Sequence, residues 1–119
     1  MHIETLIQIA IGLVFFWGFY MLKQAGKKSK SEIQELIKAG AKIIDVRSAA
    51  EFSAGHYEGA VNISLDSLSG KMGKLGKKDA PYVLYCASGA RSSAAVIMLR
   101  KNGFTNVVNA GGLGSMPRK

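Results

Sequence analysis

The chain is predicted to fold as a single α/β domain with a mostly parallel sheet flanked by helices, preceded by an apolar N-terminal segment. Strand-like runs at 42–46, 82–86 and 106–109 alternate with helical patterns, and such alternation is typical of parallel sheets. The 119 residues leave room for one small domain. The run 6–22 is charge-free and separate from this alternation.

The N-terminal run is predicted to be a membrane anchor over residues 1–22. Residues 6–22 lack charge and number about 17, the lower limit for a membrane span. No Lys or Arg precedes the run, whereas four lysines follow it, namely Lys23, Lys27, Lys28 and Lys30. The positive-inside rule then predicts a single-pass protein of the inner or plasma membrane, embedded through residues 3–22, with its N-terminus outside and its domain cytoplasmic.

Two other interpretations of this segment fit the sequence less well. A cleaved signal peptide requires a positive n-region, and residues 1–5 contain neither Lys nor Arg. A buried helix of a soluble domain would show a polar face at helical spacing, which the run lacks. Residues 23–30 are polar and basic and are interpreted as a short tether that meets anionic lipid headgroups.

The domain is predicted to begin with a short helix. Ser31 is the expected N-cap, with Gln34 at the capping-box position, and Gly40 is expected to end the helix. Its apolar stripe is formed by Ile33, Leu36 and Ile37. The apolar residues of 42–46 then predict the first strand.

The middle of the domain has weaker patterns. Residues 48–53 predict one or two helical turns, stopped by Gly55, and 60–63 predict a short strand. Residues 65–75 carry apolar side chains at roughly helical spacing, interrupted by glycines. The segment 77–81 is expected to turn the chain towards the next strand.

The strongest pattern lies in the C-terminal part. The apolar run 82–86 predicts a strand, residues 91–101 predict the best helix of the domain, and 106–109 predict a last strand. Ligand sites of parallel α/β sheets lie beyond the carboxyl ends of the strands. Cys86 stands at such an end, and a site is therefore expected there.

Cys86 is the only cysteine, so the chain can form no internal disulfide. It opens a loop of small residues, Ala87, Ser88, Gly89 and Ala90, which leads to Arg91 and a helix. Small side chains allow the loop amides to converge on an anion, and a helix N-terminus beside a cation lowers a thiol pKa. A lone cysteine is often only a small buried apolar residue, but this loop and Arg91 favour a reactive thiolate.

Several motifs in order carry a resemblance to a known family. They are IDVR at 44–47, EF at 51–52, GHYEGAVNI at 55–63, YCASGARS at 85–92, GF at 103–104 and GG at 111–112. In these motifs the chain resembles a single rhodanese domain over about residues 31–114, and the domain is placed at 31–119. The resemblance implies a five-stranded, mostly parallel sheet and a sulfurtransferase.

The resemblance implies that Cys86 is the nucleophile and carries a persulfide. The loop of Ala87, Ser88, Gly89, Ala90 and Arg91, followed by Ser92, would hold the outer sulfur. A donor such as thiosulfate would give a sulfane sulfur, and cyanide, a small thiol or a protein would accept it in ping-pong fashion. No cofactor or metal is expected, because the two histidines are isolated in the sequence, and no nucleic-acid module is present.

Four further residues are predicted to support the site structurally rather than to act in catalysis. Asp45 and Arg47 end a central strand, and the i,i+4 spacing of Arg47 and Glu51 predicts an ion pair that orders the loops. His56 lies in a Gly-His-x-x-Gly turn and is expected to form a hydrogen bond there.

The sequence departs from the family pattern in two places. Ala87 stands where family members that prefer thiosulfate often have a basic residue. No Trp follows Gly111 and Gly112, so the last helix is expected to be short or absent.

Two other functions remain as alternatives. A cysteine phosphatase of this fold requires Cys-x5-Arg, and the chain has Cys-x4-Arg, which makes a tighter loop. A membrane-anchored docking or sulfur-carrier module without enzymatic activity is the other alternative. A pure docking role would not require Cys86, which is present.

Overall fold

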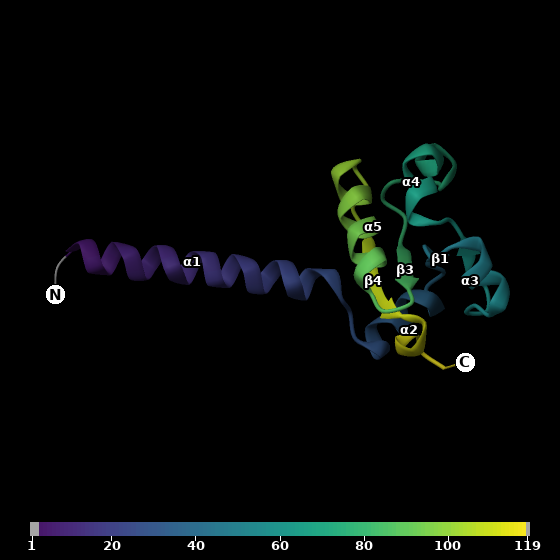
Figure 1. The fold of residues 1–119 in the computed structure, drawn as a ribbon, viewed down its shortest axis with the longest axis horizontal. Coiled ribbons are helices and arrows are strands. Elements are labelled where there is room, and N and C mark those ends of the chain that lie inside the picture. Colours follow the sequence, from purple (N-terminus) through teal and green to yellow (C-terminus); the bar gives the residue numbers. More distant parts are fainter. Residues whose placement is uncertain (1–2, 119) are drawn as a thin grey trace.

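The computed structural model describes residues 3–118, except for the side chains of 18–26. Helix α1 (Ile3–Gly26) extends away from the remainder of the chain, which forms an α/β domain (Figure 1). The described side chains of α1, residues 3–17, are all exposed. In the part of the chain that is described, no helix has both the length and the apolar character needed to cross a membrane. The predicted transmembrane helix is therefore not supported there, and residues 1–2 and the side chains of 18–22 lie outside the description.

A parallel sheet forms the centre of the domain. Its strands are β1 (Lys42–Asp45), β2 (Val61–Asn62), β3 (Tyr82–Cys86) and β4 (Val107–Gly112), in the order β2-β1-β3-β4. The expectation of five strands is wrong for the described residues, which contribute four to this sheet.

The edge beside β4 explains the missing strand. Lys27 forms an isolated parallel bridge with Asn109, and the Lys28 amide donates to the Asn109 carbonyl at 3.0 Å. Helix α1 ends at Gly26 and α2 (Lys30–Lys38) begins at Lys30. The segment between these two helices is too short to extend the Lys27–Asn109 bridge into a strand beside β4.

Helices cover both faces of the sheet (Figure 1). Helices α4 (Leu65–Lys71) and α5 (Ala90–Lys101) pack on one face, while α2 and the 3-10 turn η2 (Leu113–Ser115) lie on the other. Strand β3 alternates between the two cores: Tyr82, Leu84 and Cys86 belong to the first and Val83 and Tyr85 to the second. The Cys86 side chain therefore faces the side of α4 and α5. The shortness of η2 confirms the expectation for the last helix.

Two serine N-caps fix the starts of the short helices. Ser29, not Ser31, caps α2, and its hydroxyl accepts from the Glu32 amide at 3.3 Å. The sequence holds two overlapping capping patterns, beginning at Ser29 and at Ser31, and the chain uses the first. Helix α3 (Ala49–Ala54) begins with a complete capping box between Ser48 and Glu51.

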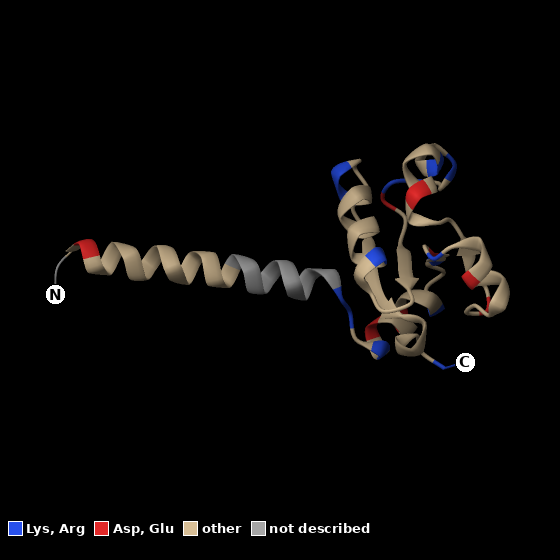
Figure 2. Ribbon diagram, in the orientation of Figure 1, with Lys and Arg blue, Asp and Glu red and all other residues tan. Residues whose placement is uncertain are grey.

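The remaining elements lie near their predicted positions, except that β4 runs on to Gly112, past the predicted end at 109. The 3-10 turn η1 (Met72–Lys74) extends α4. Positive charge gathers where α4, η1 and α5 end (Figure 2), at Lys71, Lys74, Arg100 and Lys101.

Candidate active site

Cys86 lies at the carboxyl end of β3 and begins the turn into α5. Its thiol is free and the residue is only 1% exposed. Gly89 precedes α5 with a φ of 101°, a left-handed conformation that glycine adopts without a Cβ penalty. This conformation turns the loop back over the sulfur and directs backbone amides at it.

Backbone amides and one hydroxyl group surround the Cys86 Sγ. The Gly89 amide donates at 2.9 Å, the Ser92 amide donates at 3.4 Å, and the Ser92 hydroxyl lies 3.4 Å away. Burial raises the pKa of Cys86, but hydrogen bonds from Ser92 and from the amides of Ser88 and Gly89 outweigh burial and lower that pKa below its ordinary value. The loop thus stabilises negative charge on this sulfur.

Asn109, which sequence analysis did not identify, holds Ser92 in place from β4. The buried Ser92 hydroxyl donates to Asn109 Oδ1 at 2.6 Å, and the Gly111 amide donates to the same oxygen at 2.8 Å. The Gly111 amide fixes the orientation of the side-chain amide, whose Nδ2 donates to the Gly89 carbonyl at 3.3 Å. The sequence signal for this role of Asn109 is its position as the one polar residue in the apolar run 107–110.

Replacing Ser92 with alanine is expected to raise the pKa of Cys86. When the thiol ionises, the single hydroxyl proton of Ser92 can turn from Asn109 Oδ1 to Sγ, and the alanine variant loses this donor while it keeps the backbone amides. Since hydrogen bonds to charged groups are stronger than neutral ones, alkylation of Cys86 at neutral pH should slow by roughly tenfold. The measurement is the alkylation rate as a function of pH, with Ser93→Ala as the matched control. An unchanged profile in Ser92→Ala would contradict this role of the hydroxyl.

Arg91 is held by Glu51 at the first turn of α5. Its guanidinium donates to both Glu51 carboxylate oxygens, at 2.6 and 2.9 Å. Hydrogen bonds, first from Arg91 and then from the Ser48 amide, lower the pKa of Glu51 to about 2. The predicted Arg47–Glu51 ion pair is therefore wrong, since Glu51 binds a residue 40 positions away.

Arg47 instead folds back onto Asp45 in the domain interior. Its Nη2 lies 2.7 Å from Asp45 Oδ2 and also donates to the Gly55 carbonyl at 2.7 Å. Asp45 is fully buried and Arg47 is 7% exposed. Asn62 donates through Nδ2 to the carbonyls of Asp45 and Arg47 and joins the ends of β1 and β2.

His56 lies apart from the thiol, in the turn after α3. Its Nδ1 is 2.9 Å from the Phe52 carbonyl oxygen, and its ring stacks on Phe52 with centroids 3.6 Å apart. Among the described residues, His56, Arg47 and Asp45 make their hydrogen bonds to groups other than Cys86. The structure brings Ser88, Gly89, Arg91 and Ser92 around the end of β3 and places the other three residues elsewhere.

The glycine pair at the end of β4, Gly111 and Gly112, allows the loop of residues 87–90 to pack closely against this strand. A Cβ built on Gly112 would overlap the Ala87 carbonyl oxygen, and one built on Gly89 would lie 3.3 Å from Gly111 Cα. The side chains of Ala87, Ser88 and Ala90 are exposed. The described residues contain no group of three or more His, Cys, Asp or Glu arranged to hold a metal ion.

The chain is similar to several known proteins, two of which are named as sulfurtransferases. A protein of Bacillus subtilis strain 168, the uncharacterized protein YqhL, is 37% identical over 91% of this chain and 86% of its own length. The thiosulfate sulfurtransferase PspE of Escherichia coli K12 is 35% identical over 59% of this chain and 68% of its own. The structure of the human single-domain sulfurtransferase TSTD1 has a TM-score of 0.64 and 28% identity, covering 74% of this chain and 90% of that one.

The family model of the rhodanese-like domain matches residues 29–114. This span includes the whole sheet, the Cys86 loop and the glycine pair that supports it. The chain therefore belongs to the rhodanese-like domain family.

Proposed function

We propose that this protein is a sulfurtransferase that moves a sulfane sulfur from a donor such as thiosulfate to cyanide or a thiol through a persulfide on Cys86. The observation that carries the proposal is the convergence of the Gly89 and Ser92 amides on Sγ, at 2.9 and 3.4 Å. This arrangement stabilises an anionic sulfur without a proton transfer. The likeness to a thiosulfate sulfurtransferase supports it.

The reaction has two halves. The Cys86 thiolate attacks the sulfane sulfur of thiosulfate, the sulfur–sulfur bond of the donor breaks, and sulfite leaves with the electron pair. A nucleophilic acceptor then attacks the outer sulfur, and the electron pair of the broken bond returns to Cys86 as a thiolate. Cys86 is 1% exposed, so the residues around it must move before the donor reaches the sulfur.

The test is intact mass of the full chain in detergent after incubation with thiosulfate. A gain of one sulfur, about 32 Da, is expected for the parent and not for Cys86→Ser, and cyanide should remove it. A parent that gains no sulfur from thiosulfate or from a small-molecule persulfide, with its fold verified by circular dichroism, would contradict a sulfurtransferase and favour the docking module.

We also propose that the N-terminal segment associates with the inner or plasma membrane, with the domain on the cytoplasmic side. The support is the row of exposed apolar side chains in α1, which includes Leu13, Val14, Phe15, Phe16 and Trp17. Exposed apolar area of this extent is typical of contact with lipid or another protein. Membrane fractionation tests it: the full chain should pellet with membranes and resist alkaline extraction, whereas a chain lacking residues 3–17 should not.

A further inference from the structure

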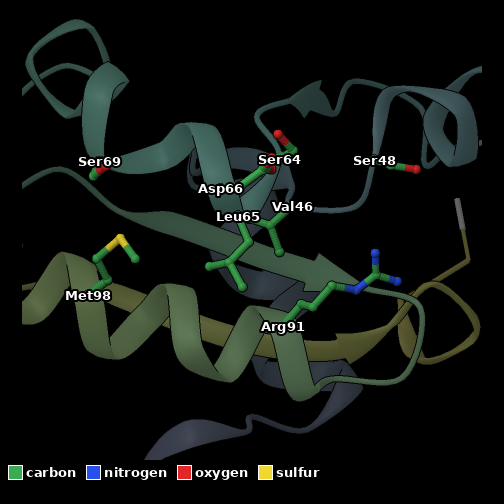
Figure 3. Close-up of a pocket in the computed structure, with 8 residues that line it drawn as sticks. All are labelled: Val46, Ser48, Ser64, Leu65, Asp66, Ser69, Arg91 and Met98. Carbon is green, nitrogen blue, oxygen red and sulfur yellow. The ribbon is translucent and has the colours of Figure 1, made fainter.

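A cavity of about 540 Å³ lies between α4 and α5 beside the cysteine loop (Figure 3). Arg91 stands at one end, close to the tip of β3, and Met98 and Ser69 stand at the other. Val46 also lines the cavity, and its amide donates to the carbonyl of Tyr85, the residue before Cys86, at 3.0 Å. The cavity therefore lies on the face of the sheet towards which the Cys86 side chain points, and it runs along the helices away from the end of β3.

The lining is suited to a small organic molecule rather than to an inorganic ion. Val46, Leu65 and Met98 supply apolar surface. Hydroxyl groups come from Ser48, Ser64 and Ser69. Concave sites with mostly apolar walls and a few polar groups are the common form of small-molecule sites.

The charged side chains of the lining favour one sign of charge on the ligand. The lining has two charged side chains, Arg91 and Asp66. Glu51 already neutralises Arg91 through two short hydrogen bonds. Asp66 is exposed at the first turn of α4 and, within the described residues, makes no side-chain hydrogen bond or ion pair. The uncompensated charge of the cavity is thus negative.

Asp66 is thus the lining side chain whose charge is not already paired. The basic side chains at the ends of α4, η1 and α5 follow the end of the cavity at Ser69 and Met98, and they are not among its lining residues. An anionic ligand therefore finds no free cation in the lining, whereas a cationic ligand finds Asp66.

We propose that this cavity binds the sulfur acceptor, and that the acceptor is a small aminothiol with a short apolar stem and a cationic amine. The inference rests on the proposed sulfurtransferase function. The ammonium group pairs with Asp66, and the stem lies against Leu65 and Val46. The thiolate of the ligand attacks the outer sulfur of the Cys86 persulfide, the bond between the two sulfurs of the persulfide breaks, and its electron pair stays on Cys86.

The experiment compares three thiols of similar size but different charge: cysteamine, 2-mercaptoethanol and 3-mercaptopropionate. The KM of each thiol is measured for the transfer of sulfur from the Cys86 persulfide of the full chain in detergent. The thiols are compared on the basis of their thiolate concentrations. The KM of cysteamine should be lower than that of 3-mercaptopropionate by about fivefold, as is usual for one exposed charge pair. Asp66→Asn should remove this preference with little change in kcat, and the distant Asp79→Asn should keep it.

Binding of S-methylcysteamine, which cannot accept sulfur, separates this inference from the function on which it rests. The analogue should shift the methyl resonances of Leu65 and Met98 in the parent, more weakly in Asp66→Asn. A parent that binds the analogue but forms no persulfide contradicts the sulfurtransferase alone. A parent that forms the persulfide but shows the same KM ratio as Asp66→Asn, or does not bind the analogue, overturns this inference alone.

Discussion

Replacing Asp45 with alanine is expected to lower the free energy of unfolding by about 3–5 kcal/mol, because it leaves a buried guanidinium without its counter-ion. The Asp45 carboxylate accepts from the Arg47 amide at 2.9 Å, from Nε at 3.0 Å and from Nη2 at 2.7 Å. After the substitution Arg47, 7% exposed, would keep only the Gly55 carbonyl and the face of the Tyr85 ring. A small domain with a total stability of about 5–15 kcal/mol would then be partly unfolded.

Urea unfolding followed by far-ultraviolet circular dichroism measures this loss. Asp79→Ala, at an exposed position, is the matched control and should change stability by less than about 0.5 kcal/mol. The double variant Asp45→Leu with Arg47→Met should recover most of the loss, since removing both charges leaves neither one unpaired. If Asp45→Ala unfolds at the same urea concentration as the parent, the pair does not stabilise the domain.

The sequence predicts best where one local signal dominates. The sequence predicts β3 at 82–86 and α5 at 91–101, and the structure has Tyr82–Cys86 and Ala90–Lys101. A short apolar run is consistent with a strand buried on both faces, and its length favours a strand over a helix. The small residues that follow Cys86 then lead into the helical pattern of 91–101. For the same reasons the position of Cys86 at a strand end could be predicted.

Side-chain partners could not be predicted in the same way. The i,i+4 rule ties Arg47 to Glu51 only if both lie on one helix, but Arg47 precedes the cap of α3 at Ser48. The observed partners depend on which strand ends meet at the edge of the sheet. Glu51 reaches Arg91, and Asn109 reaches Ser92, because β1, β3 and β4 are neighbours. The fifth strand was likewise inferred from resemblance, whereas the length of chain between α1 and α2 decides it.

Gly112→Ala is expected to slow persulfide formation on Cys86 by roughly a hundredfold, since a displacement of about 1 Å at a reacting group can have an effect of that size. A methyl group at this position would overlap the Ala87 carbonyl oxygen. To relieve the overlap, the loop must move away from β4. That movement changes the 2.9 Å contact between the Gly89 amide and Cys86 Sγ.

Gly114→Ala distinguishes this steric effect from a general effect of substituting glycine. Gly114 lies in the same segment, and a Cβ built there meets nothing within 4 Å. Single-turnover sulfur transfer from thiosulfate should therefore be slow in Gly112→Ala and normal in Gly114→Ala, with the pKa of Cys86 raised only in the former. Equal rates in the two variants would show that the loop tolerates the added methyl group, and that contact with β4 does not position the amides around the sulfur.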